Sequence, residues 1–316
     1  MSRLTVSIAT RDWDHLTPLL LGDVRSDLVD LRVERLDTLL PAVREADGFD
    51  GVETSLARYV LLRAAHDDRV TGIANFVMRG FRHRCVLVAN DSRLADLAAL
   101  KGGRIGVTGW HDSGNIWTRA ALRDAGIGVE DAMWFVGRLT AAHPIADRLR
   151  GYGRAGRIET CPDDAPMLDL LSEGQLDAVC TPFWPEACYQ PDPPFRPLLR
   201  DFVEAERASF VRNGFVPGHH MITFRSDFAR AHPWALPEVS RLLDLSRQVW
   251  RTRRRKYAET SPWLIDELLR AARIFPDSAD ASGAAANRPM LAAFCDALIA
   301  QGIVRTPLAV DDLFDV

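Results

Sequence analysis

Short runs of strand-forming hydrophobic residues alternate along this chain with longer segments in which hydrophobic residues recur every three or four positions. The first pattern predicts buried β-strands, and the second predicts amphipathic helices. The predicted strands cover residues 4–9, 31–36, 49–53, 73–78, 85–89, 104–107, 133–136, 157–161, 176–180 and 221–224. The predicted helices cover residues 15–21, 38–46, 56–65, 94–100, 114–125, 166–173 and 237–250. This alternation is typical of an α/β protein with largely parallel sheets and helices on their faces.

The length and the order of these elements predict two lobes. A chain of 316 residues is too long for one ordinary hydrophobic core. We expect a discontinuous first lobe of residues 1–90 and 215–316, and a second lobe of residues 91–214. This organisation resembles the type II periplasmic-binding-protein fold, an α/β fold in which each lobe is a mixed sheet flanked by helices. The ligand cleft of that fold lies between the lobes, at the carboxyl ends of the strands.

The composition of the chain indicates which kinds of binding partner are unfavourable. The hydrophobic share of 47%, the charged share of 26% and the net charge of −4 are typical of a globular protein and do not favour nucleic acid or a membrane as partner. The five cysteines are scattered and lack the spacing of metal ligands. The first strand begins at residue 4 with no leader pattern before it. We therefore expect a cytoplasmic protein with reduced thiols and no metal, and we leave homo-oligomer formation open.

A basic segment between two predicted strands is the first candidate for a binding site. Residues 79–84 read Arg-Gly-Phe-Arg-His-Arg. Arginine can hold a carboxylate through two parallel hydrogen bonds, and histidine exchanges a proton near neutral pH. An isolated basic loop is more often solvated surface, but a position at a strand end facing the expected cleft favours an anion site.

Several short motifs occur in the order found in one family of enzymes. They are Glu53-Thr54-Ser55, Arg79-Gly80-Phe81-Arg82-His83, Trp117-Thr118-Arg119, Gly174-Gln175-Leu176-Asp177-Ala178, Val216-Pro217-Gly218-His219-His220, Pro233-Trp234, Pro262-Trp263, Asn287-Arg288, Gln301-Gly302 and Leu313-Phe314. On these motifs the chain resembles the 4,5-dihydroxyphthalate decarboxylase family nearly from end to end. The resemblance implies a cofactor-independent decarboxylase whose partner is a small hydroxylated aromatic carboxylic acid. The loop at residues 106–111 departs from the family pattern, which leaves the identity of the acid open.

Loss of CO2 from an aromatic ring requires a proton donor, a cation that holds the carboxylate, and a partner for the phenol. The candidate catalytic residues are His83, His220 and Glu53; both histidines stand at the family's histidine positions. The candidate substrate-binding residues are Arg79, Arg82, Ser55, Trp110, His111, Ser113, Arg119 and Trp184. Arg119 could instead support its loop, and Trp184 could instead be a packing residue between the lobes.

Two other functions fit the same residues. A ligand-binding or sensor protein would use the arginines without turnover. Another lyase on this fold, such as chorismate dehydratase, would eliminate water instead of CO2. The Arg-x-Phe-Arg-His motif favours the decarboxylase.

Overall fold

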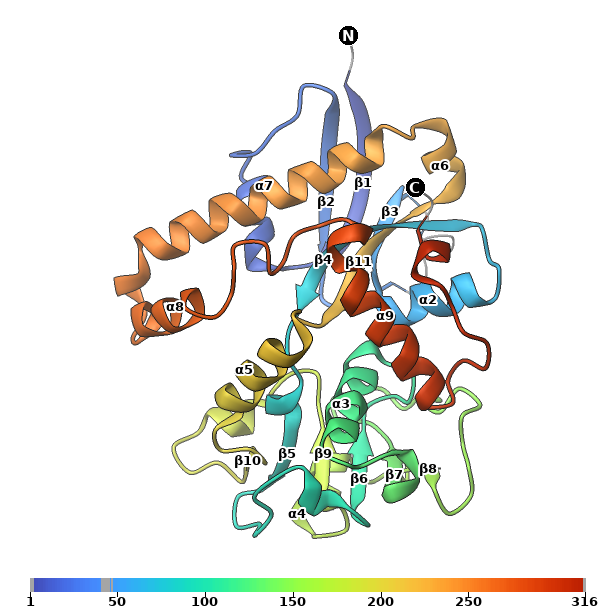
Figure 1. Cartoon of the computed structure of the whole chain (residues 1–316), viewed down its shortest axis with the longest axis vertical. Coiled ribbons are helices and arrows are strands. Elements are labelled where there is room, and N and C mark those ends of the chain that lie inside the picture. Colours follow the sequence, from blue (N-terminus) through green and yellow to red (C-terminus); the bar gives the residue numbers. More distant parts are fainter. Residues whose placement is uncertain (1–2, 41–45, 47, 315–316) are drawn as a thin grey trace. The chain divides into compact units, whose positions relative to one another are not determined.

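The chain forms two compact units, each built around its own sheet (Figure 1). The computed structural model describes residues 3–40, 46 and 48–314. Unit 1 comprises Met1–Arg79, Gly218–Leu291 and Leu308–Val316, and unit 2 comprises Gly80–Pro217 and Ala292–Pro307. Within the described part of the chain, no helix is both long enough and apolar enough to cross a membrane.

The sheet of unit 1 has five strands in the order β2-β1-β3-β11-β4. Their bounds are β1 Leu4–Arg11, β2 Val29–Leu36, β3 Gly51–Ser55, β4 Val70–Arg79 and β11 Gly218–Arg225. β1 runs parallel to β2 and β3, whereas β11 runs antiparallel to β3 and β4. The ends of β1, β3 and β4 and the beginning of β11 therefore lie at one edge of this sheet. At that edge His220 pairs with Ser55, and Gly218 pairs with Arg79.

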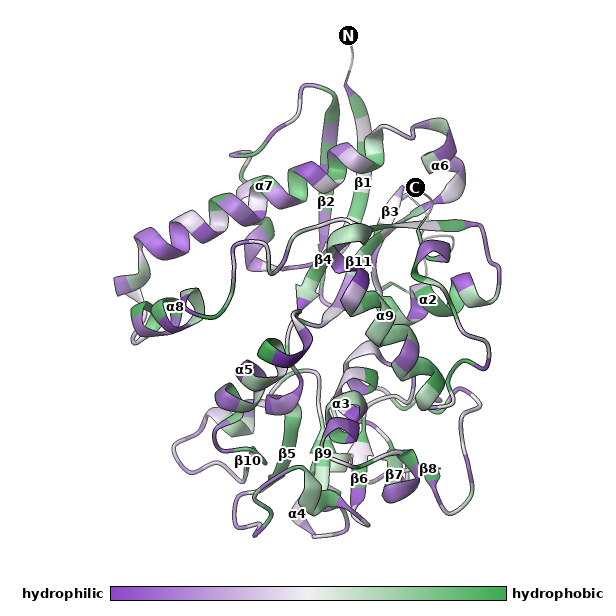
Figure 2. Cartoon of the chain, viewed as in Figure 1, coloured by the Kyte–Doolittle hydropathy of each residue, from purple (hydrophilic) through white to green (hydrophobic). Residues whose placement is uncertain are grey.

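Helices cover both faces of this sheet, with the exception of α8, which has no buried residue. The helices of unit 1 are α1 Thr17–Leu20, α2 Leu56–Ala64, α6 Ser226–Ala231, α7 Ala235–Lys256, α8 Leu264–Ala272 and the first half of α9 Ala284–Ala300, with a 3-10 turn η1 at Asp14–Leu16. Apolar residues recur every three or four positions on α7, where Val239 and Leu242 pack in one cluster with Val6 and Ile8 of β1. Hydrophobic and polar residues accordingly alternate along α7 (Figure 2). On β3, Val52 belongs to a separate core cluster.

The sheet of unit 2 has six strands in the order β10-β5-β9-β6-β7-β8. The strands are β5 Val86–Ala89, β6 Arg104–Val107, β7 Met133–Val136, β8 Ile158–Thr160, β9 Ala178–Cys180 and β10 Phe195–Pro197, and the helices are α3 Ser113–Asp124, α4 Met167–Ser172 and α5 Phe202–Asn213. β5 is antiparallel to β9 and β10, while β6 is parallel to β7 and β9. Two mixed sheets flanked by helices confirm the expected fold class.

Helix α5 has no counterpart among the expected elements, and three expected segments take another form in the structure. Residues 94–100 contain only a 3-10 turn at Ala98–Leu100, because the side chains of Ser92 and Asp96 accept hydrogen bonds from nearby backbone N–H groups and favour turns over a helix. The loop expected at residues 189–197 ends in strand β10; Pro197 is tolerated there because β10 is an edge strand. Of the helix expected at residues 38–46, residues 41–45 lie outside the described part, and residues 38–40 are not helical.

Candidate functional site

A buried carboxylate forms the centre of the polar cluster at the strand-end edge of unit 1. Glu53 on β3 is 1% exposed. Its Oε2 accepts hydrogen bonds from Thr10 Oγ1 at 2.7 Å, the Arg11 backbone N–H at 2.8 Å and Trp13 Nε1 at 2.9 Å. Its Oε1 lies 2.6 Å from His220 Nδ1. The parallel pairing of β1 with β3, and the return of β11 beside β3, bring these five residues together.

The environment of Glu53 keeps it ionised. Burial opposes the charged form, but the hydrogen bond and positive charge of His220, together with hydrogen bonds from Thr10 and Arg11, outweigh burial and lower the pKa of Glu53. An ionised carboxylate only accepts hydrogen bonds, so His220 Nδ1 must carry the proton of this contact. The carboxylate also stabilises a positive charge on the imidazole. The His220 side chain is 12% exposed, so a small part of it remains accessible.

A chain of ring contacts begins at His220 of this pair. The Trp13 indole lies edge-on to His220 at 6.4 Å between ring centroids and stacks on His15 at 6.5 Å. Trp250 lies edge-on to His15, at 6.2 Å between ring centroids. Burial, followed by the charge of Arg247, lowers the pKa of His15 to about 3, although Glu53 acts in the opposite direction. The His15 ring is therefore neutral at physiological pH.

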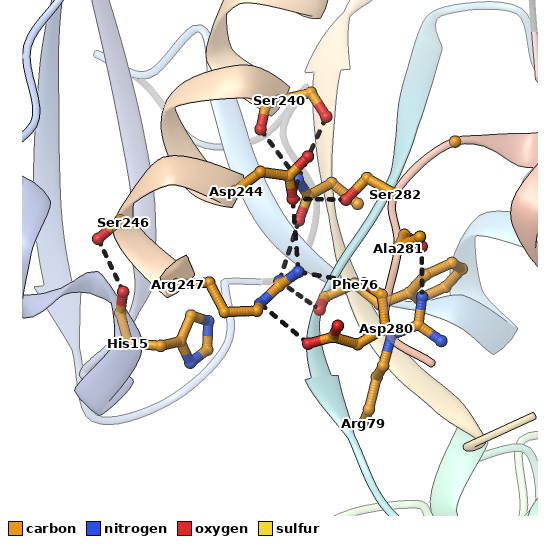
Figure 3. A network of polar contacts seen from close by, with 12 residues as sticks. His15, Phe76, Arg79, Ser240, Asp244, Ser246, Arg247, Asp280, Ala281 and Ser282 are labelled. Carbon is orange, nitrogen blue, oxygen red and sulfur yellow. Dashed lines mark hydrogen bonds and ion pairs between the residues drawn. The ribbon is translucent and has the colours of Figure 1, made fainter. Parts of the chain in front are cut away.

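A network of arginines lies at the end of β4 (Figure 3). Arg79 Nη2 donates to Asn287 Oδ1 at 2.5 Å and to the Ala281 carbonyl at 3.3 Å. Burial and the neighbouring charge of Arg247 lower the pKa of Arg79 to about 9, against the opposing effect of Asp244. The charged form of Arg79 is thus disfavoured by its burial and by Arg247, and an anion bound to it would favour that form.

Arg247 joins α7 to β4 in the same network (Figure 3). Its Nη2 donates to the Phe76 carbonyl at 3.0 Å and to Asn75 Oδ1 at 3.2 Å. It forms ion pairs with Asp244 at 3.4 Å and with Asp280 at 3.9 Å. These bonds hold the guanidinium of Arg247 in place. Burial lowers the pKa values of Arg79 and His15, and the charge of Arg247 lowers them further.

The rest of the basic segment belongs to unit 2. Arg82 is 5% exposed and donates to the Pro182 carbonyl at 3.1 Å. His83 is buried; desolvation lowers its pKa, with Glu206 and Asp124 opposing. Arg84 forms a bidentate ion pair with Glu206. Arg82 and His83 are therefore not part of a solvated surface loop.

Arg119 and Trp110 hold each other in the core of unit 2. Both are buried, and the Arg119 guanidinium lies 4.0 Å from the centre of the Trp110 ring. Arg119 also donates to the Trp110 carbonyl and, at 2.7 Å, to Gln301 Oε1. Burial lowers the pKa of Arg119 to about 9, with Cys180 and Asp112 opposing. The alternative that Arg119 supports its loop accounts for these contacts without a ligand.

The remaining predicted residues have structural contacts of their own. Ser55 accepts a hydrogen bond from the Arg58 backbone N–H and thereby caps α2. Ser113 is the buried first residue of α3, and the His111 ring lies 6.0 Å from Tyr152. Trp184 Nε1 donates to the Arg84 carbonyl, and its ring contacts Tyr189 and Phe202.

The predicted residues divide between the units. Glu53, Ser55, Arg79 and His220 belong to unit 1, and Arg82, His83, Trp110, His111, Ser113, Arg119 and Trp184 belong to unit 2. Among the candidates for catalysis, the structure brings Glu53 and His220 into direct contact. In the described part of the chain, no group of three His, Cys, Asp or Glu side chains could hold a metal ion.

Sequence reasoning missed Thr10, Trp13, His15 and Arg247. A signal for three of them was present. Residues 10–15 read Thr-Arg-Asp-Trp-Asp-His and directly follow the apolar part of the first strand, where ligand-binding residues of parallel sheets gather. Arg247 gave no such signal, because it lies inside a regular amphipathic helix.

Two relatives show to which family the chain belongs. No protein-family model matches the chain. A 4,5-dihydroxyphthalate decarboxylase from Pseudomonas putida is 30% identical over 218 residues, which cover 64% of this chain and 79% of the relative. The chain belongs to the 4,5-dihydroxyphthalate decarboxylase family. A second member, from Comamonas testosteroni, is 28% identical over 321 residues, covering 99% of this chain and 97% of that protein.

Solved structures show the fold of this family member. The alkanesulfonate-binding protein SsuA from Xanthomonas axonopodis pv. citri, bound to MOPS, matches over 100% of this chain and 99% of its own, with a TM-score of 0.56 and 14% identity. The periplasmic aliphatic sulphonate binding protein SsuA from Escherichia coli matches over 99% and 98%, with a TM-score of 0.53 and 13% identity. These matches confirm the expected type II periplasmic-binding-protein fold.

Proposed function

We propose that this member of the family is a cofactor-independent decarboxylase of a hydroxylated aromatic carboxylic acid, with His220 as the proton donor. The observation that carries the proposal is the contact between His220 Nδ1 and the buried Glu53 carboxylate. The names of the two relatives support the reaction class. Glu53 acts through His220 as a positioning residue, since it fixes the ring and stabilises its positive charge.

The reaction needs one proton and no redox change. The protonated His220 gives its proton to the ring carbon that bears the carboxylate, while the phenolic oxygen supplies electron density to the ring. The bond between that carbon and the carboxylate then breaks, CO2 leaves, and the bonding electrons restore aromaticity. His220 regains a proton from solvent. A positioned acid of this kind typically contributes 10²–10⁴-fold in rate.

Arg79 is the proposed carboxylate-binding residue of unit 1. It lies at the same sheet edge as His220, since Gly218, two residues before His220, pairs with it. Its hydrogen bonds to Asn287 and Ala281 orient the guanidinium through neutral oxygens. A substrate carboxylate would compensate a charge that burial and, after it, Arg247 make unfavourable.

His220 is preferred to His83 as the donor because only His220 has a carboxylate bonded to its ring. The Nδ1 atom of His83 is buried and has no hydrogen-bond partner among the described residues, and burial disfavours its charged form. A histidine that resists protonation is a poor source of protons.

Release of CO2 from a panel of hydroxybenzoic and hydroxyphthalic acids tests the reaction, with His220→Gln and His83→Gln as a matched pair. We expect His220→Gln to lower kcat by about 10²–10⁴-fold with little change in KM, and His83→Gln to retain most of kcat. A loss of kcat in His83→Gln alone would transfer the role to His83. Acids that bind without releasing CO2 would show a ligand-binding protein instead.

A further inference from the structure

His15 combines three features that a packing residue does not need. It follows β1 at the strand-end edge of unit 1, and its backbone carbonyl is fixed by a 2.7 Å hydrogen bond from Ser246 Oγ. Its ring contacts both Trp13 and Trp250, at 6.5 and 6.2 Å between ring centroids. Its Nε2 atom is buried and has no hydrogen-bond partner in the described part of the chain. Buried polar atoms without partners are rare and destabilising, so this one calls for a bonding group that the protein itself does not supply.

Burial and the charges around His15 limit the kind of chemical group that can bond to its Nε2 atom. Arg247 and Arg251 on α7 oppose a positive charge on the ring, and the effect of Glu53 does not overcome them and burial. A neutral imidazole has one donor and one acceptor nitrogen. It is a weak ligand for a carboxylate beside arginines that bind carboxylates better, but it matches a hydroxyl group, which donates and accepts.

Trp13 connects His15 to the proposed proton donor. The same indole stacks on His15, lies edge-on to His220, and donates its N–H to Glu53. A ring whose carboxylate-bearing carbon lies at His220 would extend its other substituents along this aromatic surface. The phenolic hydroxyl is the substituent of the proposed substrate that a neutral imidazole can recognise.

We propose that His15 recognises the phenolic hydroxyl of the substrate through its buried Nε2 atom, and so selects hydroxylated over unsubstituted aromatic acids. The inference rests on the proposed function for the identity of the substrate. It adds a residue that determines specificity and takes no part in the proton transfer.

Binding measurements test the proposal without requiring turnover. Every protein in this test carries His220→Gln, which suppresses turnover, and isothermal titration calorimetry gives Kd for 4,5-dihydroxyphthalate and for phthalate with wild-type His15, with His15→Phe and with His15→Gln. Phenylalanine keeps the aromatic packing but has no nitrogen, and glutamine restores a donor and an acceptor. His232→Phe is the matched control, since His232 packs against Phe228 away from this cluster.

We expect the protein with wild-type His15 to prefer the hydroxylated acid, and His15→Phe to reduce the ratio of the two Kd values by about 3- to 10-fold, the effect of one net hydrogen bond. Phthalate binding should change little, His15→Gln should recover part of the ratio, and His232→Phe should leave it unchanged. An equal loss for both acids, an unchanged ratio, or no preference with wild-type His15 would overturn the inference.

The outcomes separate this inference from the proposed function. If no acid releases CO2 but His15→Phe abolishes the preference for the hydroxylated acid, the role of His15 stands and the decarboxylase activity falls. If CO2 is released and the ratio is unchanged in His15→Phe, the activity stands and the role of His15 falls.

Discussion

Replacing Glu53 by glutamine should destabilise the protein in a pH-dependent way. The carboxylate is 1% exposed and receives four hydrogen bonds. Glutamine keeps one acceptor oxygen for Thr10, Arg11 and Trp13, but it presents an amide N–H₂ to the N–H of His220. Loss of one partner of a buried charged pair typically costs about 3–5 kcal/mol. Because the glutamine oxygen still serves three donors, we expect the free energy of unfolding to fall by about 3 kcal/mol at pH 7.

The direction of the pH dependence follows from the lowered pKa of Glu53. In the unfolded chain the carboxyl titrates near 4.5, and in the folded protein it titrates below that value. Its stabilising effect is therefore fully present above pH 4.5 and is lost as the pH falls through the folded pKa. The difference in stability between the wild type and Glu53→Gln should shrink below pH 4.5.

Urea unfolding followed by tryptophan fluorescence at pH 7, 5, 4 and 3 measures this difference. Glu259→Gln is the control, because Glu259 is exposed, and it should match the wild type at every pH. A difference below about 1 kcal/mol at pH 7, or one that stays constant down to pH 3, would refute the linkage.

Three further predictions concern single side chains. Arg79→Met, compared with Arg79 in a His220→Gln background that suppresses turnover, should weaken binding of 4,5-dihydroxyphthalate by about 10- to 100-fold in calorimetry, as expected for a charged hydrogen bond; an unchanged Kd would remove Arg79 from the site. Ser55→Ala should lower the free energy of unfolding by about 1 kcal/mol through loss of the α2 cap while leaving that Kd unchanged, and weaker binding would show a second role for Ser55. Burial raises the pKa of Cys180 to about 12 and those of Cys161 and Cys295 to about 11. The half-buried Cys188 should therefore be the first thiol of the native protein to react with Ellman's reagent. Rapid labelling of Cys180 would contradict the packing of unit 2.

The sequence predicted most of the elements but not the pairing of the site residues. Alternating and helical periodicity located most strands and α7, because these patterns follow directly from burial of one face. Glu53 and His220 were both candidates on family motifs, but their contact spans 167 positions and depends on β11 entering the sheet beside β3.

The roles of the buried arginines were harder to predict from the sequence. Arg79, Arg82 and Arg119 look alike in a sequence, since an arginine in a loop or on a helix can hold a ligand or a carbonyl oxygen equally well. Only the structure shows that Arg119 is stacked on Trp110 and bonded to Gln301. His15 escaped notice because its neutral state depends on its burial and then on Arg247, which is far away in the sequence.

The position of β11 has a consequence for biosynthesis. β11 separates β3 from β4 in the sheet, yet residues 80–217 lie between β4 and β11 in the chain. A nascent chain that ends before Gly218 therefore exposes the unpaired backbone groups of two strands, which invites aggregation or chaperone binding. Unit 1 is completed late, and the Glu53–His220 pair forms only when β11 closes this gap.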